Sequence, residues 1–241
     1  MKVRIDKMLS NSGLGSRKQI KLQAKKGLIQ VNGITEKDSS KIIDTQKDEI
    51  KYNGEIIKYT PYIYLMMNKP RGVVSATEDN YDKTVIDLLS GEHKLFNPFP
   101  VGRLDKDSEG LLLITNDGQL SHNLLSPKKH ENKTYYVEVE EEVTEEDIKS
   151  FAEGVLLKED NYQTLPAKLQ IIKSGYPSIC LVTITEGKFH QVKRMFNAIN
   201  NEVTYLKRIS MGTLNLDNTL KPGQYRPLTK EEITALTGAF L

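Results

Sequence analysis

The chain has 241 residues, of which 38% are hydrophobic and 27% are charged, with a formal net charge of +2 at pH 7. It contains no run of about 18 apolar residues and begins without the apolar segment of a secretory signal, so we expect a cytoplasmic protein that does not enter a membrane. Its single cysteine, Cys180, excludes an internal disulfide and a cysteine metal cluster, and is expected to be a buried strand residue.

Charge is unevenly distributed along the chain. Residues 1–60 hold 13 Lys and Arg against 7 Asp and Glu, a net charge of +6, which leaves −4 for residues 61–241. A basic amino-terminal segment is typical of a module that faces nucleic acid. Charge alone also allows the alternative that the lysines only keep a small domain soluble.

The first predicted helix begins after Ser16 and stops at Gly27. Serine is a favoured N-cap, glycine a favoured terminator, and good helix formers lie between them. Ile20 and Ala24 are four residues apart and are expected on the buried face. The remaining surface would be basic and available to RNA, because it carries Arg17, Lys18, Lys21 and Lys25.

A predicted hairpin follows this helix. Residues 28–31 are expected to form a strand, Asn32-Gly33 a tight turn, and Ile34 the start of the returning strand. The amino-terminal region resembles the S4 RNA-binding domain in three blocks: Arg4-Ile5-Asp6-Lys7, Ser16-Arg17 and Gly27-Leu28-Ile29-Gln30-Val31-Asn32-Gly33. The resemblance implies a small α/β RNA-binding module over residues 1–60.

The pattern changes after Tyr59-Thr60-Pro61, so we expect a second domain over residues 61–241. Strands are predicted at residues 62–67, 111–115, 134–139, 169–172 and 179–185. Helices are predicted after Thr144, after Thr229, where a capping box begins, and over residues 188–199. Strands outnumber helices without regular alternation, which favours an α+β fold with a mixed, mostly antiparallel central sheet.

The densest candidate site is the segment 102–118. It starts as a charged loop with Asp105 and Asp107, enters the apolar run Leu111-Leu112-Leu113-Ile114, and ends in a predicted turn at Asn116-Asp117-Gly118. A carboxylate beside a rigid buried strand is held firmly enough for catalysis. From spacing alone, solvated loop carboxylates and the paired carboxylates of a glycoside hydrolase remain alternatives.

The same segment resembles the signature of a known family. Gly102-Arg103-Leu104-Asp105 followed by Asp107-Ser108-Glu109-Gly110-Leu111-Leu112-Leu113 is similar to the signature of the RsuA family of pseudouridine synthases. Further matches are Asn68-Lys69-Pro70-Arg71-Gly72, Lys133-Thr134-Tyr135, the block from Glu186 to Phe196, and the block from Pro222 to Thr229. The pair His190-Gln191 is more similar to the small-subunit ribosomal RNA enzymes than to their large-subunit relatives.

This resemblance implies roles for individual residues. Asp105 would be the catalytic aspartate, Tyr135 the aromatic that stacks on the target uracil, and Arg103 a residue that holds the flipped nucleotide. A basic residue that pairs with the aspartate is expected near position 193, with Lys193 favoured over Arg194. His190 is interpreted as a polar helix residue and receives no role.

These residue types suit the conversion of uridine to pseudouridine, in which the N1 glycosidic bond breaks and uracil rejoins the sugar through C5. An ionised carboxylate can attack the sugar or remove its proton, and both roles gain from a neighbouring cation. The stacked base must be extruded and then held by aromatic stacking. The family implies no cofactor and no metal, and the sequence contains no evident cluster of metal ligands.

The expected partner is RNA. The resemblance implies an enzyme that acts on 16S ribosomal RNA, with uridine 516 as the family precedent, either on naked RNA or in a small-subunit assembly intermediate. We expect the enzyme to be a monomer. Lys128, Lys129 and Lys133 are expected to guide the RNA backbone. The main alternative is a non-catalytic RNA-binding or ribosome-assembly factor.

Overall fold

The computed structural model describes residues 2–57, 59, 61–126 and 130–238, and residue contacts divide the chain into two units. The first contains Met1–Ile63 and Leu88–Phe99, and the second contains Tyr64–Asp87 and Pro100–Leu241. The sequence patterns did not indicate that segment 88–99 groups with the amino-terminal part. In the described part of the chain, no helix combines the length and the apolar character needed to cross a membrane.

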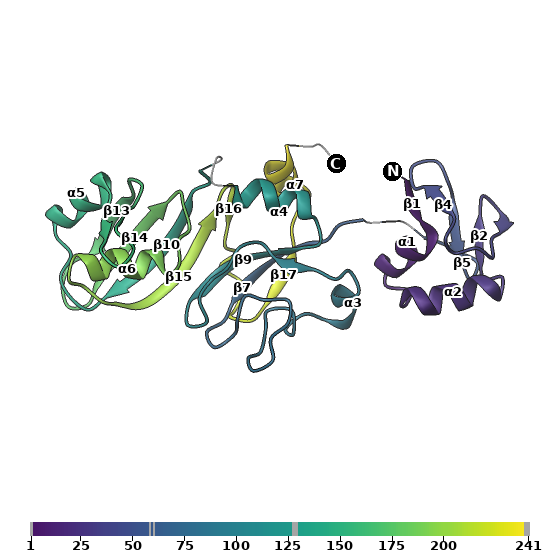
Figure 1. Cartoon of the computed structure of the whole chain (residues 1–241), viewed down its shortest axis with the longest axis horizontal. Helices are drawn as coiled ribbons and strands as arrows, with labels where there is room; N and C mark the ends of the chain where they lie inside the picture. Colours follow the sequence, from purple (N-terminus) through teal and green to yellow (C-terminus); the bar gives the residue numbers. More distant parts are fainter. Residues whose placement is uncertain (1, 58, 60, 127–129, 239–241) are drawn as a thin grey trace. The chain divides into compact units, whose positions relative to one another are not determined.

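The first unit contains short helices and two small antiparallel sheets (Figure 1). Strand β1 (Lys2–Arg4) pairs with β4 (Ile42–Asp44), and the four-stranded sheet has the order β3 (Ile34–Thr35), β2 (Ile29–Val31), β5 (Ile50–Tyr52), β6 (Glu55–Ile56). The helices are α1 (Ile5–Asn11), α2 (Arg17–Lys25) and α3 (Gly91–Lys94), of which only α2 was predicted. The predicted hairpin is confirmed as β2 and β3.

Helix α2 forms as its sequence predicts. A capping box starts it: the Gln19 backbone N–H donates to the Ser16 hydroxyl (3.3 Å), and the Ser16 N–H donates to the Gln19 side chain (2.8 Å). Ile20 and Ala24 have no exposed surface. The four predicted basic residues are all exposed: Arg17, Lys18, Lys21 and Lys25. The basic helix face is therefore confirmed.

A nine-stranded sheet, formed by the second unit except for Phe99 of β8, has the order β13-β14-β10-β15-β9-β7-β17, with β16 paired to β15 and β8 to β9. In that order the strands are Lys168–Lys173, Ser178–Ile184, Lys133–Val139, Val203–Met211, Glu109–Thr115, Tyr64–Lys69 and Tyr225–Pro227, with β16 at Leu214–Asn215 and β8 at Phe99–Pro100. Along this order the pairs are antiparallel except β15 with β9, which is parallel. The predicted α+β fold with a mixed, mostly antiparallel sheet is confirmed.

Strand β15 joins the two halves of this sheet (Figure 1). It pairs with β10 along its length but with β9 only at Lys207, opposite Glu109, and at Arg208, opposite Gly110. Gly110 has a φ of +106°, and a Cβ at this position would lie 2.2 Å from the carbonyl oxygen of Arg208. Only glycine permits this approach, so the loop that carries Asp105 enters β9 against the Arg208 backbone.

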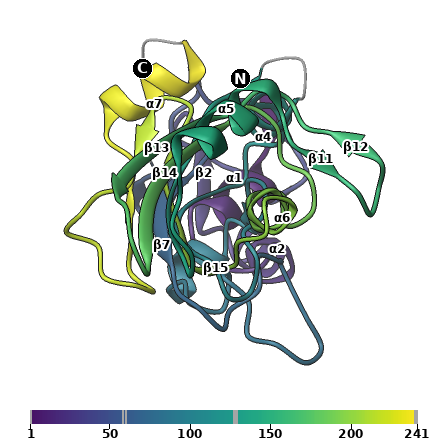
Figure 2. The same cartoon turned by 90° about the vertical axis from the view of Figure 1, so that its left-hand side faces the viewer.

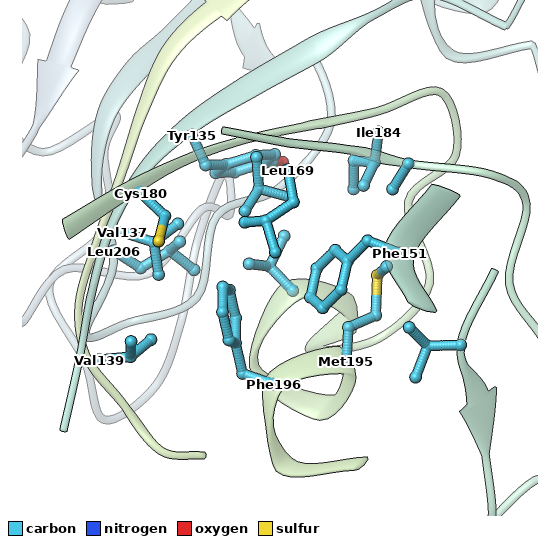
Figure 3. Close-up of a cluster of buried hydrophobic side chains, with 14 of the residues drawn as sticks. Tyr135, Val137, Val139, Phe151, Leu169, Cys180, Ile184, Met195, Phe196 and Leu206 are labelled. Carbon is cyan, nitrogen blue, oxygen red and sulfur yellow. The ribbon is translucent and has the colours of Figure 1, made fainter. Parts of the chain in front are cut away.

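Each half of the sheet has its own apolar cluster. In one, Phe151 of α5 (Glu145–Glu153) and Phe196 of α6 (Gln191–Ala198) lie 5.0 Å apart between ring centroids and pack with inward strand residues such as Val137 and Cys180 (Figure 3). The other includes Leu120 of α4 (Gly118–Leu125) and partly buried residues of α7 (Lys230–Thr237). The hairpin β11 (Leu156–Leu157) and β12 (Tyr162–Gln163) lies beside α6 (Figure 2).

Candidate active site

A buried lysine fastens the loop that carries Asp105. Lys69, at the end of β7, is 0% exposed, and its Nζ donates to the carbonyl oxygens of Pro70 (3.0 Å), Asp105 (2.9 Å) and Ser108 (2.9 Å). Burial lowers the pKa of Lys69 to about 8, although nearby carboxylates, Asp105 first among them, oppose the shift. The ammonium thus holds the backbone at Asp105 itself and at Ser108.

The Asp105 carboxylate faces two cationic or potentially cationic side chains. Lys193 Nζ lies 3.6 Å from Oδ2 of Asp105, and His190 Nε2 lies 3.5 Å from Oδ1. Lys193 also donates to both oxygens of Asp107, at 2.6 and 2.7 Å. Partial burial works against ionisation of Asp107, but the hydrogen bonds and the charge of Lys193 lower the pKa of its carboxyl. Lys193 is therefore held between two carboxylates, and Asp107 fixes its position.

The two basic residues considered as partners of Asp105 lie in different surroundings. Lys193 approaches Asp105, whereas Arg194 pairs with Glu159 (3.3 Å) and Asp160 (2.7 Å) on the turn between β11 and β12. Successive residues of a helix point about 100° apart, so one turn of α6 cannot direct both cations to the same carboxylate. The geometry assigns the pairing to Lys193.

His190 lies nearer to the site than its interpretation as a helix residue suggests. It is the N-cap of α6, with φ 48° and ψ 33°, rather than a residue inside the helix. Its ring stacks on Phe189 at 3.7 Å between centroids, and its side chain is 40% exposed. The left-handed backbone turns the ring toward Asp105, which no helical pattern could indicate.

A cavity of about 140 Å³ opens at Asp105. Side chains from the loop, from β10, from β15 and from the start of α6 line it; those that bear on the chemistry are Arg103, Asp105, Ser108, Lys133, Tyr135, His190 and Arg208. In the described ranges, no group of three or more His, Cys, Asp and Glu side chains is placed to hold a metal ion. The arrangement offers one carboxylate, one aromatic ring and several cations to a small planar molecule.

Tyr135 belongs both to this cavity and to an apolar cluster. It is 7% exposed and packs with the same cluster as Val137 and Leu169 (Figure 3), yet its ring also lines the cavity beside Asp105. Tyr135 can therefore pack in the apolar cluster and line the cavity at the same time. Lys133, two residues earlier, donates to the Glu131 carbonyl oxygen (3.0 Å), and its pKa is lowered by burial and then by the charge of Arg208.

Sequence reasoning missed Ser108 and Arg208 in this cavity. Arg208 is 2% exposed, and its Nε donates to the carbonyl oxygen of Leu111 (2.8 Å). Among the described residues, neither Arg208 Nη2 nor the Ser108 hydroxyl has a hydrogen-bond partner, although both are buried. The sequence pattern could have indicated Arg208. Leu206 and Arg208 occupy alternate inward positions of one strand, and a cation at such a position is unusual.

The other predicted RNA contacts are divided among the first unit, the cavity and residues that the structure does not describe. The basic residues of α2 belong to the first unit, whereas the cavity lies within the second. Arg103 is exposed at the cavity edge. Lys128 and Lys129 lie outside the residues that the structure describes.

Two protein-family models match the chain. The family model for RNA pseudouridylate synthases matches residues 63–198, more than half of the chain, and the S4 domain model matches residues 3–50. The chain belongs to the RNA pseudouridylate synthase family. This synthase carries an S4 domain at its amino-terminal end, as the sequence predicted.

Several relatives of this pseudouridine synthase match along nearly its whole length. A Bacillus subtilis protein described as an uncharacterized RNA pseudouridine synthase is 52% identical over 235 residues, covering 97% of this chain and 98% of the relative. The ribosomal small subunit pseudouridine synthase A of Vibrio parahaemolyticus is 39% identical over 234 residues, covering 97% and 99%. A crystal structure of a pseudouridylate synthase superposes with a TM-score of 0.69 at 37% identity and covers 98% of this chain and 100% of the other.

Proposed function

We propose that this chain converts one uridine of 16S ribosomal RNA, uridine 516 by family precedent, into pseudouridine. The observation that carries the proposal is the Asp105 carboxylate, which lines a cavity of about 140 Å³ together with the Tyr135 ring. A cavity of about 150 Å³ holds one benzene ring, so a single pyrimidine matches the size of this one. The names of the small-subunit relatives support the choice of RNA.

The reaction begins when the target nucleotide leaves the RNA stack and its base enters the cavity against Tyr135. Stacking on the ring compensates for part of the lost base stacking, and Arg103 at the cavity edge holds the flipped nucleotide. The Asp105 carboxylate then either attacks C1′ of the ribose or removes the proton from C2′. In both cases the N1–C1′ bond breaks, uracil turns, and a bond forms between C5 and C1′ as the Asp105 oxygen leaves C1′ or the proton returns to C2′.

Lys193 supplies the counter-charge for Asp105. A carboxylate that must stay ionised in a partly enclosed cavity gains from a nearby cation, and 3.6 Å is close enough for Coulomb attraction without a tight hydrogen bond that would occupy the reacting oxygen. The bonds to Asp107 keep the ammonium in this position. Asp107 therefore positions Lys193, and Asp105 carries the chemistry.

The amino-terminal region binds the RNA. Residues 1–60 would form the S4-like RNA-binding domain and residues 61–241 the catalytic domain, with the exposed cations of α2 on phosphates and Lys133 near the target nucleotide. The substrate is 16S RNA, free or in a small-subunit assembly intermediate, and the enzyme acts as a monomer in the cytoplasm. The family resemblance and the basic face of α2 support this division of work.

The deciding experiment maps pseudouridine in 16S RNA from cells that lack this gene. We expect one modified position to disappear, to return with the wild-type gene, and to stay absent with Asp105→Asn. If the map does not change while subunit assembly does, the protein is an assembly factor and the proposal fails. If Asp105→Asn restores the modification, the enzyme is a synthase but Asp105 is not its catalyst.

A further inference from the structure

The cavity contains more positive charge than the pairing of Asp105 requires. Besides Asp105, it is lined by the side chains of Lys133 and Arg208. Among the described residues, no carboxylate lies within ion-pairing distance of either cation. Burial first, and then the charge of Arg208, lower the pKa of Lys133, while the carboxylates of Glu131 and Glu186 oppose part of this shift from beyond ion-pairing distance. Two unpaired cations beside a cavity favour a ligand that carries negative charge.

Arg208 has a donor that nothing in the described structure uses. Its Nε is bound to the Leu111 carbonyl oxygen at 2.8 Å, which fixes the plane of the guanidinium. Its Nη2 is buried and has no partner among the described residues, and the whole residue is only 2% exposed. Buried polar groups in native proteins are nearly always satisfied, so an orphaned donor beside a cavity indicates that a ligand completes it.

The strand register places this donor next to the expected position of the base. Arg208 of β15 is the partner of Tyr135 of β10, and residues directly opposite each other on neighbouring strands project from the same face about 5 Å apart. A pyrimidine that stacks on Tyr135 therefore has an edge near the guanidinium. The edges of uracil carry two carbonyl oxygens, one on C2 and one on C4.

The carbonyl oxygens of uracil acquire negative charge at a defined step of the reaction. When the N1–C1′ bond breaks, its electron pair stays on N1 and is delocalised over O2 and O4, so the detached uracil is an anion. Later the C5–C1′ bond forms, C5 loses its proton, and N1 gains one, so the overall reaction is an isomerisation. This charge appears whether Asp105 attacks the sugar or removes its proton.

We propose that Arg208, assisted by Lys133, binds a carbonyl oxygen of the departing uracil and stabilises the uracil anion between cleavage and reattachment. This inference rests on the proposed function. Donors that are fixed in advance where charge develops are among the largest contributions to catalysis, and removal of one costs about 100- to 1000-fold in rate. The bond to Leu111 pre-orients Arg208 in this way.

The test compares two RNA substrates that differ only in the target base, uridine or 5-fluorouridine. Fluorine withdraws electrons, so the fluorinated base carries negative charge more easily and depends less on Arg208. Single-turnover loss of the N-glycoside is measured after nuclease digestion by mass spectrometry, since the fluorinated base has no C5 proton to release. For Arg208→Met we expect the uridine rate to fall about 100-fold and the ratio of fluorinated to normal rate to rise about 10-fold.

Two further variants keep the result interpretable. Lys207→Met removes a cation from the neighbouring position, whose side chain lies on the other face of β15, and should leave the ratio unchanged. Lys133→Met should raise the ratio less than Arg208→Met does, and it decides the question if Arg208→Met does not fold. An unchanged ratio in the folded variants overturns the inference and makes Arg208 structural. A wild-type protein that converts no uridine refutes the proposed function itself.

Discussion

Replacement of Lys69 by methionine tests whether the catalytic loop depends on a buried ammonium. Three carbonyl oxygens within 3.0 Å would lose their donor, among them that of Asp105. Against this loss stands the penalty for burying the charge. The pKa falls from 10.5 to about 8, and at about 1.4 kcal/mol per unit this corresponds to about 3 kcal/mol.

The loss of the three hydrogen bonds and the relief of the buried charge nearly cancel in the free energy of unfolding but not in activity. Each lost hydrogen bond costs about 1 kcal/mol, so we expect the free energy of unfolding of Lys69→Met to stay within about 2 kcal/mol of wild type. The Asp105 backbone, however, loses its anchor. A displacement of the reacting group by about 1 Å costs about 100-fold in rate, which is the loss that we expect in single-turnover pseudouridine formation.

Lys106→Met is the matched control, because Lys106 lies on the same loop but its Nζ makes an exposed ion pair with Asp82. Such a pair contributes little, and the variant should turn over within about 3-fold of wild type. Wild-type turnover in Lys69→Met, in a protein that is folded by its thermal midpoint, would refute the reasoning, since the loop would then be rigid without its buried donor.

Titration of Lys69 should change the stability and the activity of the protein in opposite directions. Below pH 8 the folded protein bears the cost of a charged, buried Lys69. As the pH rises from about 8 toward the unfolded-state pKa of 10.5, Lys69 becomes neutral in the folded protein and this cost disappears. The free energy of unfolding of wild type therefore rises by up to about 3 kcal/mol relative to that of Lys69→Met. Turnover of wild type should fall over the same range, because a neutral amine has two N–H donors for three carbonyls. Melting curves and single-turnover rates at a series of pH values measure both.

Further predictions address the site and the RNA-binding face. Asp105→Asn should reduce tritium release from C5-labelled RNA at least about 10,000-fold with little change in RNA affinity, whereas Asp107→Asn, which only loosens Lys193, should cost about 10-fold. Tyr135→Phe should keep RNA binding and slow turnover about 100-fold, since the ring remains and the hydroxyl is lost; equal rates would show that the hydroxyl takes no part. Replacing the four exposed cations of α2 by glutamine should flatten the salt dependence of RNA binding by up to about 3 in slope and leave turnover at saturation unchanged.

The elements that were predicted correctly are those whose signals are local. Helix α2 has its cap, its stop and its buried pair within 12 residues of sequence, from Ser16 to Gly27, and it forms there. Helix α4 was missed although its signal is also local. Asn116-Asp117-Gly118 was interpreted as a turn, but Asp117 accepts a hydrogen bond from the Leu120 N–H (3.0 Å) and is the N-cap of a helix.

The candidate site could be predicted only where a motif names its residues. Asp105 and Tyr135 follow from the resemblance, and the structure brings them to one cavity. The roles of Lys69 and Arg208 depend on strand order instead. Lys69 reaches the loop because β7 pairs with β9, and Arg208 reaches the cavity because β15 lies between β10 and β9. A local pattern does not show which strands are neighbours, so neither role could be predicted from the sequence, although a cation at an inward strand position marks Arg208 as unusual.

Gly110 offers a direct test of how the loop and Arg208 are held together. A methyl group at this position would lie 2.2 Å from the Arg208 carbonyl oxygen and 2.7 Å from its nitrogen, and both belong to backbone that cannot rotate away. The φ of +106° adds backbone strain for any residue with a Cβ. Gly110→Ala should therefore push β9 from β15 and displace both the Asp105 loop and Arg208.

Gly72→Ala separates backbone strain from steric overlap. Gly72 has a similar positive φ of +79°, but a methyl group there would meet no atom within 4 Å among the described residues. We expect Gly72→Ala to lower the free energy of unfolding by about 1 kcal/mol, from backbone strain alone, and Gly110→Ala by about 3 kcal/mol or more, from strain and overlap together. Chemical denaturation measures both values, and single-turnover assays should find Gly110→Ala impaired at temperatures where it is fully folded. Equal destabilisation by the two substitutions would show that the β9 and β15 backbones can separate freely, and the close approach would then not be what aligns Asp105 with Arg208.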